Sequence, residues 1–337
     1  MGGNIFVNSH TTRRLGKEEY NRYVKEVLDL LLSVNSSLSL HVTRAIRSKE
    51  DFGDLDIIVK GSKERSLIED SLDRLGYPLS KNGDVTSFLY IDFQVDLIFT
   101  NESHYRYSCH YFDWNDLGNL VGRMSKQFGF KHGHNGLYYV LRDDNRVIKE
   151  FLLSTEYLDI INILGLDKFK FKSGFDAYEE LFDFIIASPY FNSDSFKLEN
   201  LNNINRVRDR KRKTYNMFLK YIESKNIEGK GTSKLSYEEK ESFVLNKFPH
   251  IRHEVQELKD KVKLGNKVKE RINGRIIMTL FKDIDGKTVG KYIDILKERR
   301  PDLYSETVLD MTEEEVHLAI LTTINEYKKD TKDTSNV

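Results

Sequence analysis

The sequence has little cysteine, little proline and no excess of charge, and each shortage narrows what the protein can be. Cys109 is the only cysteine among 337 residues, so neither an intramolecular disulfide nor a zinc site built from thiolates can form. This favours a reducing compartment, and we expect a cytoplasmic protein. Four prolines, with 39% hydrophobic and 31% charged residues, are typical of a helix-rich soluble fold.

Two further absences concern location and partners. No apolar run approaches the ~20 residues that a membrane-spanning helix needs, and residues 1–12 lack the basic-then-apolar pattern of a secretory signal. We therefore expect no membrane partner. Lysine plus arginine equals aspartate plus glutamate at 53 each, so the net charge gives no direct sign of nucleic acid binding. A local basic patch could still provide it, because the field near a cleft matters more than the total charge.

Hydrophobic periodicity predicts an α+β region at the start of the sequence. In residues 17–34 apolar side chains recur about every 3.6 positions, which indicates an amphipathic helix, and a second helix is predicted at 62–75. Runs rich in aliphatic, aromatic and β-branched residues predict four strands, at 38–42, 54–59, 85–90 and 93–100. Helices and strands in this order make a compact α+β unit.

The rest of the sequence is predicted to be mostly helical. A helix at 115–131 and a hairpin at 137–151 come first, and beyond residue 154 nearly every segment has helical periodicity. The glycine- and lysine-rich residues 225–236 are the best linker candidate. We therefore expect an α+β fold with a mixed sheet and helices on one face, followed by an all-helical region. The expected domains are residues 1–153, 154–225 and 237–330.

Two aspartates lie in a predicted strand that is otherwise apolar. In the segment FGDLDIIV, Asp54 and Asp56 share one face of the strand, ~7 Å apart between Cα atoms. Carboxylates this close repel each other unless a cation neutralises them, and Mg²⁺ prefers oxygen ligands. A third acid should come from a neighbouring strand, and we expect Asp96, with Asp92 as the alternative. The simpler interpretation, two solvent-facing residues of an amphipathic strand, is disfavoured by the apolar run and by this second acidic strand.

This pattern resembles the superfamily of DNA polymerase β, poly(A) polymerases and CCA-adding enzymes. In that superfamily a Gly-Gly or Gly-Ser turn precedes Asp-x-Asp, and a third Asp follows on a later strand. Here Thr43-Arg44 occupies the position of the turn, nine residues precede Asp54, and Val95-Asp96-Leu97 is similar to the third-acid strand. Ala45-Ile46-Arg47 is similar to the residues that follow the glycines in CCA-adding enzymes. The sequence departs from the family pattern at positions 43 and 44, where neither Gly nor Ser is present.

The resemblance implies a nucleotidyltransferase palm and a site for two Mg²⁺ ions, with Mn²⁺ as a substitute. Asp54 and Asp56 would bind both ions, and Asp96 would complete the site of the ion that activates the attacking 3′-hydroxyl. The expected reaction is in-line displacement of pyrophosphate from an NTP. The residues expected to contact the nucleotide are Thr43, Arg44 and Arg47.

Two features favour RNA as the acceptor. The densest basic stretch could lie along phosphates, although a solvated helix face is the alternative; its residues are Arg206, Arg208, Arg210, Lys211, Arg212 and Lys213. Residues 273–327, in a predicted helical segment interrupted at Gly286 and Gly290, are similar to a region near the RNA-binding end of CCA-adding enzymes and poly(A) polymerases, although an ordinary helix-turn-helix packing contact is the alternative.

These features together lead to one hypothesis and two alternatives. The hypothesis is template-independent transfer of a nucleotide from an NTP to the 3′ end of an RNA, with tRNA as one candidate. One alternative is a nucleotidyltransferase that acts on a protein or a small molecule. The other is a catalytically degenerate RNA-binding protein, which the missing Gly-Ser turn would explain. The fold alone cannot separate these, because one fold serves many acceptors.

Overall fold

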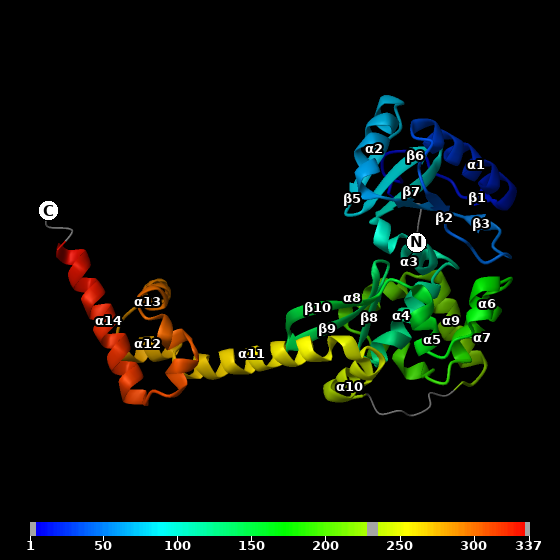
Figure 1. Ribbon diagram of the computed structural model, residues 1–337. Helices are drawn as coiled ribbons and strands as arrows, with labels where there is room; N and C mark the ends of the chain where they lie inside the picture. The colour runs from blue at the N-terminus through cyan, green and yellow to red at the C-terminus, as the bar shows by residue number, and fades with distance from the viewer. Residues whose placement is uncertain (1–4, 228–234, 334–337) are drawn as a thin grey trace. The chain divides into compact units, whose positions relative to one another are not determined.

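The computed structural model describes residues 5–227 and 235–333, which divide into two compact units (Figure 1). Unit 1 extends to Pro249 except for Asp143–Asn145, and unit 2 consists of those three residues and the chain from His250 onward. The fold is mixed α+β, with a mixed sheet near the start of the chain and a helical C-terminal region. Most of the candidate linker at 225–236 lies outside the described residues.

A five-stranded mixed sheet forms the centre of the first part of unit 1. Its strand order is β2-β4-β7-β6-β5, and of its neighbouring pairs only β4 and β7 are parallel. The bounds are β2 Leu40–Val42, β4 Asp54–Lys60, β5 Leu79–Asn82, β6 Val85–Tyr90 and β7 Phe93–Thr100. The four predicted strands are all present, but β5 was missed because its sequence, LSKN, has no hydrophobic alternation. A separate pair joins β1 (Leu15–Gly16) to β3 (Asp51–Phe52).

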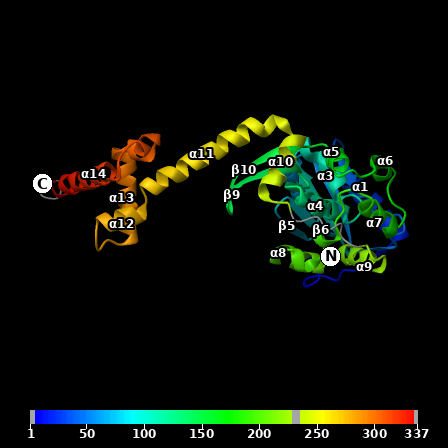
Figure 2. The same cartoon turned by 90° about the horizontal axis from the view of Figure 1, so that it is seen from below.

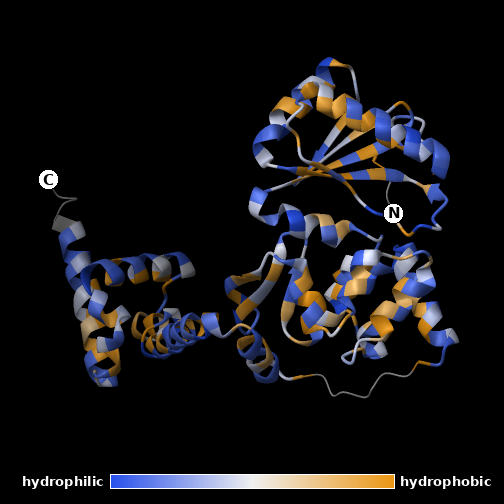
Figure 3. Ribbon diagram, turned by 45° about the vertical axis from the view of Figure 1, so that its right-hand side comes forward, coloured by the Kyte–Doolittle hydropathy of each residue, from blue (hydrophilic) through white to orange (hydrophobic). Residues whose placement is uncertain are grey.

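Two helices cover one face of this sheet (Figure 1). α1 (Lys17–Val34) and α2 (Arg65–Arg74) pack on Leu55, Ile57 and Val59, the odd-numbered residues of β4. The same core takes in β6 and β7, and the strands of the sheet are largely hydrophobic (Figure 3). Alternation along a strand therefore sends the even-numbered residues of β4, including both aspartates, to the other face.

The opposite face is also covered in part by a helix. Cys109 of α3 (Tyr105–Phe112) packs with Ile58 of β4 and Ile98 of β7. The sequence predicted helices on one face only, and α3 corrects that prediction. The face that carries the aspartates is thus bounded by a helix rather than open to solvent.

The rest of unit 1 is a small antiparallel sheet surrounded by helices. The sheet has the order β10-β9-β8, with β8 at Phe130–Gly133, β9 at Gly136–Asp143 and β10 at Arg146–Ser154. The helices are α4 Leu117–Gln127, α5 Tyr157–Ile163, α6 Lys168–Ser173, α7 Tyr178–Ile186, α8 Asn203–Arg210, α9 Lys213–Ser224 and α10 Tyr237–Lys247. Two boundaries differ from the prediction. The helix expected at 115–131 ends at Gln127, since Gly129 has a φ of +86°. Within the region predicted to be mostly helical, the helical periodicity of residues 208–224 is divided between α8 and α9, with a break at Lys211–Arg212 (Figure 2).

Unit 2 is helical and has its own core. Its α-helices are α11 Arg252–Arg271, α12 Gly274–Leu280, α13 Gly286–Arg299 and α14 Glu313–Asp333. The short 3-10 helices η6 Pro301–Tyr304 and η7 Glu306–Leu309 lie between α13 and α14. Ile277, Leu296 and Ile320 are fully buried at its centre. The helical pattern was expected to be interrupted at Gly286 and Gly290, but both glycines belong to α13 and the interruption precedes them. Helix α13 begins there because Asp285 caps it by accepting a hydrogen bond from the Thr288 amide at 2.7 Å. None of the helices in the described part of the chain combines the length and the hydropathy that a bilayer crossing requires.

Candidate active site

Asp54, Asp56 and Asp96 come together on the face of the sheet that carries α3. The parallel register of β4 and β7 pairs Asp56 with Asp96, and Asp54 lies two residues earlier on the same face of β4. One carboxylate oxygen of each residue lies within 4.8 Å of the others. This triad could hold a metal ion, because carboxylate oxygens are the ligands of hard divalent cations.

The structure also decides between the two candidates for the third acid. Asp92 lies in the turn before β7, where Ile91 has a φ of +59°. Its carboxylate accepts hydrogen bonds from Arg13 Nε at 2.5 Å and from the Tyr23 hydroxyl at 3.4 Å. Asp96 is therefore the residue that joins Asp54 and Asp56.

The protein compensates the charge of the triad only in part, through the charge of Lys49, which lowers the pKa of Asp54 and Asp56. Burial raises the pKa of Asp54 and, more strongly, of Asp56, whose pKa is raised further by the charges of Asp54 and Asp96. Burial also raises the pKa of Asp96 to about 6, although Gln94 Nε2 donates to both of its carboxylate oxygens at 2.9 Å. No Lys, Arg or His of the described residues forms an ion pair with the three aspartates. A bound cation would relieve this repulsion, so the oxygen-only donor set fits a divalent metal.

Asp54 and Asp56 line a cleft of about 790 Å³ within unit 1. A cleft of this size suits a nucleotide or another small ligand. Three parts of unit 1 form its walls: the loop from Thr43 to Gly53, the end of α3 with the residues after it, and the turn between α8 and α9. Its basic side chains are Arg14, Arg44, Lys49, Lys211, Arg212 and Lys213.

The loop after β2 is held in place by a segment that follows α3. Thr43 lines the cleft, and its amide donates to the Asp56 carbonyl at 3.1 Å. Asp113 accepts hydrogen bonds from the Arg44 amide and from Arg44 Nε, both at 2.8 Å, and from His41 Nε2 at 2.9 Å. Burial alone would raise the pKa of Asp113, but hydrogen bonds from His110, His41 and Arg44 lower it.

The next two residues after Asp113 complete this attachment. The Trp114 amide donates to the Arg44 carbonyl at 2.5 Å, and Asn115 Oδ1 accepts from the Ile46 amide at 3.0 Å. Trp114 and Asn115 have φ values of +62° and +61°, a conformation that non-glycine residues adopt only when their surroundings impose it. The loop after β2 is thus fixed by contacts from outside it.

The three predicted nucleotide-binding residues do not lie together. Thr43 and Arg44 line the cleft, but the Arg44 guanidinium is paired with Asp113 at 2.6 Å and lies over the Trp114 ring. Arg47 is not among the residues that line the cleft. Its guanidinium pairs with Asp176 at 2.5 Å and bonds the Ser173 carbonyl, so it joins the loop to the segment between α6 and α7.

The basic stretch 206–213 is also divided. Arg208 and Arg212 form ion pairs with Asp209, and Lys211, Arg212 and Lys213 line the cleft. The sequence did not predict that Lys211, Lys213 and Lys49 line the cleft, because no local pattern indicates which distant segment a lysine will face.

The fold and the site define an α+β protein with three clustered aspartates on adjacent parallel strands at a cleft. No protein-family model matches the sequence, and no curated protein matches it either. The function is therefore argued from the chemistry of the site.

Proposed function

We propose that the protein is a magnesium-dependent nucleotidyltransferase with a palm of the DNA polymerase β type. It transfers a nucleotide from an NTP to the 3′ end of an RNA, for which tRNA is one candidate, and releases pyrophosphate. The observation that carries this proposal is the carboxylate triad, with two acids on β4 and the third on its parallel neighbour β7. The two acids of β4 line a cleft that basic side chains also line.

The residues of the triad have distinct tasks in this reaction. Asp54 and Asp56, which line the cleft, would bind both metal ions, and Asp96 would complete the site of the ion that activates the attacking hydroxyl. Gln94 fixes the orientation of the Asp96 carboxylate through its two hydrogen bonds. Magnesium bound there would neutralise charge on the triphosphate and lower the pKa of the attacking 3′-hydroxyl. Thr43, attached through its backbone to Asp56, lines the same cleft.

The charge distribution of unit 2 supports an RNA acceptor. Residues 252–300 carry 14 lysines and arginines against 8 aspartates and glutamates, whereas residues 301–333 carry 3 against 9. A basic region of this kind favours a phosphate backbone, because most nucleic acid affinity comes from contacts of Lys and Arg with phosphates. A transferase for a small molecule would need no such region.

The test is incorporation of label from each NTP, supplied separately with Mg²⁺ and bulk RNA. Wild-type protein should label RNA, and Asp56→Asn should lower the rate by about 10³-fold or more, since a misplaced metal forfeits several kcal/mol of transition-state stabilisation. Asp92→Asn is the matched control, because it removes an acid of β7's entry turn that lies outside the triad, and it should keep the wild-type rate.

Other outcomes would replace the proposal. Label on protein or on a small molecule, with none on RNA, would identify a different acceptor. RNA binding with no incorporation by wild-type protein would favour a catalytically degenerate RNA-binding protein.

A further inference from the structure

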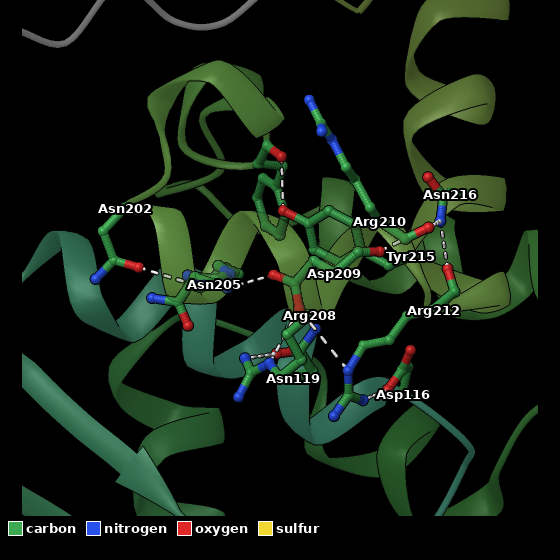
Figure 4. Close-up of polar contacts among 12 residues, drawn as sticks. Asp116, Asn119, Asn202, Asn205, Arg208, Asp209, Arg210, Arg212, Tyr215 and Asn216 are labelled. Atoms are coloured by element: carbon green, nitrogen blue, oxygen red, sulfur yellow. Dashed lines mark hydrogen bonds and ion pairs between the residues drawn. The ribbon is translucent and has the colours of Figure 1, made fainter. Parts of the chain in front are cut away.

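The break between α8 and α9 changes what the basic stretch 206–213 can do. At its centre Asp209 is fully buried and contacts three guanidinium groups, of which Figure 4 labels those of Arg208 and Arg212. Arg123 of α4 forms a buried ion pair with it, Arg208 Nε lies 3.2 Å from Oδ1, and Arg212 Nε lies 3.7 Å from Oδ1. Arg123 is buried, and Arg208 and Arg212, which keep 49% and 33% of their side chains exposed, are held at the surface by their pairing with Asp209.

Two more contacts fix the turn that follows α8 (Figure 4). Arg212 also pairs with Asp116 at the start of α4, and Arg208 donates to Asn119 Oδ1 at 2.9 Å. The turn is therefore attached to α4 on one side.

Lys211 and Lys213 are the two lysines of this turn. Both are exposed, both line the cleft that holds Asp54 and Asp56, and neither forms an ion pair with another described residue. Lys49 lines the same cleft, and its ammonium group lies over the Phe52 ring, 4.6 Å from the centroid. Three lysines from two distant segments thus converge on the cavity that the carboxylates share.

We propose that Lys211 and Lys213, together with Lys49, form a polyphosphate-binding site that replaces the missing glycine turn. The site takes the triphosphate of a metal-bound nucleotide, and this assignment rests on the proposed function. The arginines that sequence similarity assigns to the nucleotide cannot fill this role while they pair with acids, Arg44 with Asp113 and Arg47 with Asp176.

A polyphosphate fits these lysines better than an RNA backbone does. An RNA strand needs cations spaced along an exposed stripe, but the stretch is broken at 211–212, and Arg208 and Arg212 are tied to Asp209 and Asp116. The two lysines instead face a concave site with carboxylates on another wall. A metal-bound triphosphate contacts both walls at once, because its metal needs the carboxylates and its remaining negative charge needs the lysines.

The experiment measures binding of Mg²⁺-tripolyphosphate by isothermal titration calorimetry. Lys211→Ala/Lys213→Ala should raise the dissociation constant about tenfold or more, as expected for the loss of hydrogen bonds to a charged ligand. Lys211→Arg/Lys213→Arg should restore most of the affinity. Lys220→Ala/Lys225→Ala is the matched control, since it removes two exposed lysines of α9 and its C-terminus that do not line the cleft, and it should change the affinity less than twofold.

Two further readouts make the outcome unambiguous. Mn²⁺ binding, followed by electron paramagnetic resonance, should be the same in Lys211→Ala/Lys213→Ala as in wild type, which shows that the triad is intact. Unchanged tripolyphosphate affinity in that variant, with weaker RNA binding, would overturn the proposal and return these lysines to RNA. If wild-type protein binds tripolyphosphate through the lysines but transfers no nucleotide, the proposed function fails and the polyphosphate site stands.

Discussion

Unit 1 holds carboxylates away from solvent in two regions that differ in what neutralises them. Beside α4, Asp209 is surrounded by Arg123, Arg208 and Arg212. Asp113 likewise accepts hydrogen bonds from Arg44 and His41, and these partners lower its pKa despite burial. Each of these acids carries its own counter-charge within the chain.

On the sheet the situation is reversed. Asp54, Asp56 and Asp96 lie together without an ion pair among the described residues, and burial raises the pKa of all three. Folding does not gain from such an arrangement, since like charges repel and their hydration is lost. The comparison therefore separates two roles: acids compensated by arginine or histidine organise the fold, and an uncompensated group indicates a site for a cation from outside.

The largest expected effect comes from breaking the compensated cluster. Asp209→Ala removes the counter-charge of Arg123, whose side chain is only 6% exposed, and should lower the free energy of unfolding by about 3–5 kcal/mol. Urea denaturation measures this. Replacing both partners with apolar residues, Arg123→Met/Asp209→Leu, should recover much of the loss. A cost below about 1 kcal/mol for Asp209→Ala would show that the cluster does not organise the fold.

At the triad, protein stability should depend on a bound ion rather than on a partner residue. Mg²⁺ that binds only the folded state at a hundredfold excess over its dissociation constant stabilises by about 2.7 kcal/mol. We expect a stabilisation of this size in urea denaturation against an EDTA baseline. Asp56→Asn should abolish it and Asp92→Asn should keep it. Equal stabilisation of the two variants would mean that the ion binds elsewhere.

The triad is also the part of the molecule that sequence predicted best. Period-two alternation placed Asp54 and Asp56 on one face of a strand, and β4 begins at Asp54 as predicted. The third acid required knowledge of which strand neighbours β4. Alternation along the predicted strand at 93–100 narrowed the choice to Asp96, with Asp92 as the alternative, and the register of β4 with β7 places Asp96 beside Asp56.

The contacts around the triad could not be predicted, because they join distant segments. Arg44 and Asp113 are 69 residues apart, and nothing local shows that Asp113, Trp114 and Asn115 fix the loop after β2. The contacts of the basic stretch could not be predicted for a related reason. Its charges suggest an exposed face, but Asp209 within it is buried and pairs with Arg208 and Arg212.

A smaller effect concerns the pH dependence of the triad without metal. The pKa of Asp96 is about 6 in the folded protein, against ~3.9 in an unfolded chain. The unfolded state loses its proton first, so wild-type protein in EDTA should lose stability as pH rises from about 4 to about 6. Relative to Asp96→Asn the loss should be about 2 kcal/mol, a figure reduced for partial exposure to solvent. Added Mg²⁺ should remove this dependence, and an equal slope in the two proteins would contradict it.

The smallest effect should have the opposite pH direction, because it comes from a buried base without a counter-charge. His132 accepts or donates one hydrogen bond, 2.7 Å from Nδ1 to the Tyr107 hydroxyl, and its Nε2 is buried. Burial lowers the pKa of His132 to about 3, so its contribution to stability is present above pH ~6.5 and is lost as pH falls. Between pH 7 and pH 5, urea denaturation should show wild-type protein losing about 1–2 kcal/mol relative to His132→Gln. Tyr107→Phe removes the same hydrogen bond but keeps the buried imidazole. It should therefore lower the free energy of unfolding by about 1 kcal/mol relative to wild type, and this cost should not become smaller at high pH. If wild type and His132→Gln instead lose stability in parallel, the imidazole is already solvated in the folded state. Of the groups compared here, the triad alone would then have its charged form disfavoured by burial.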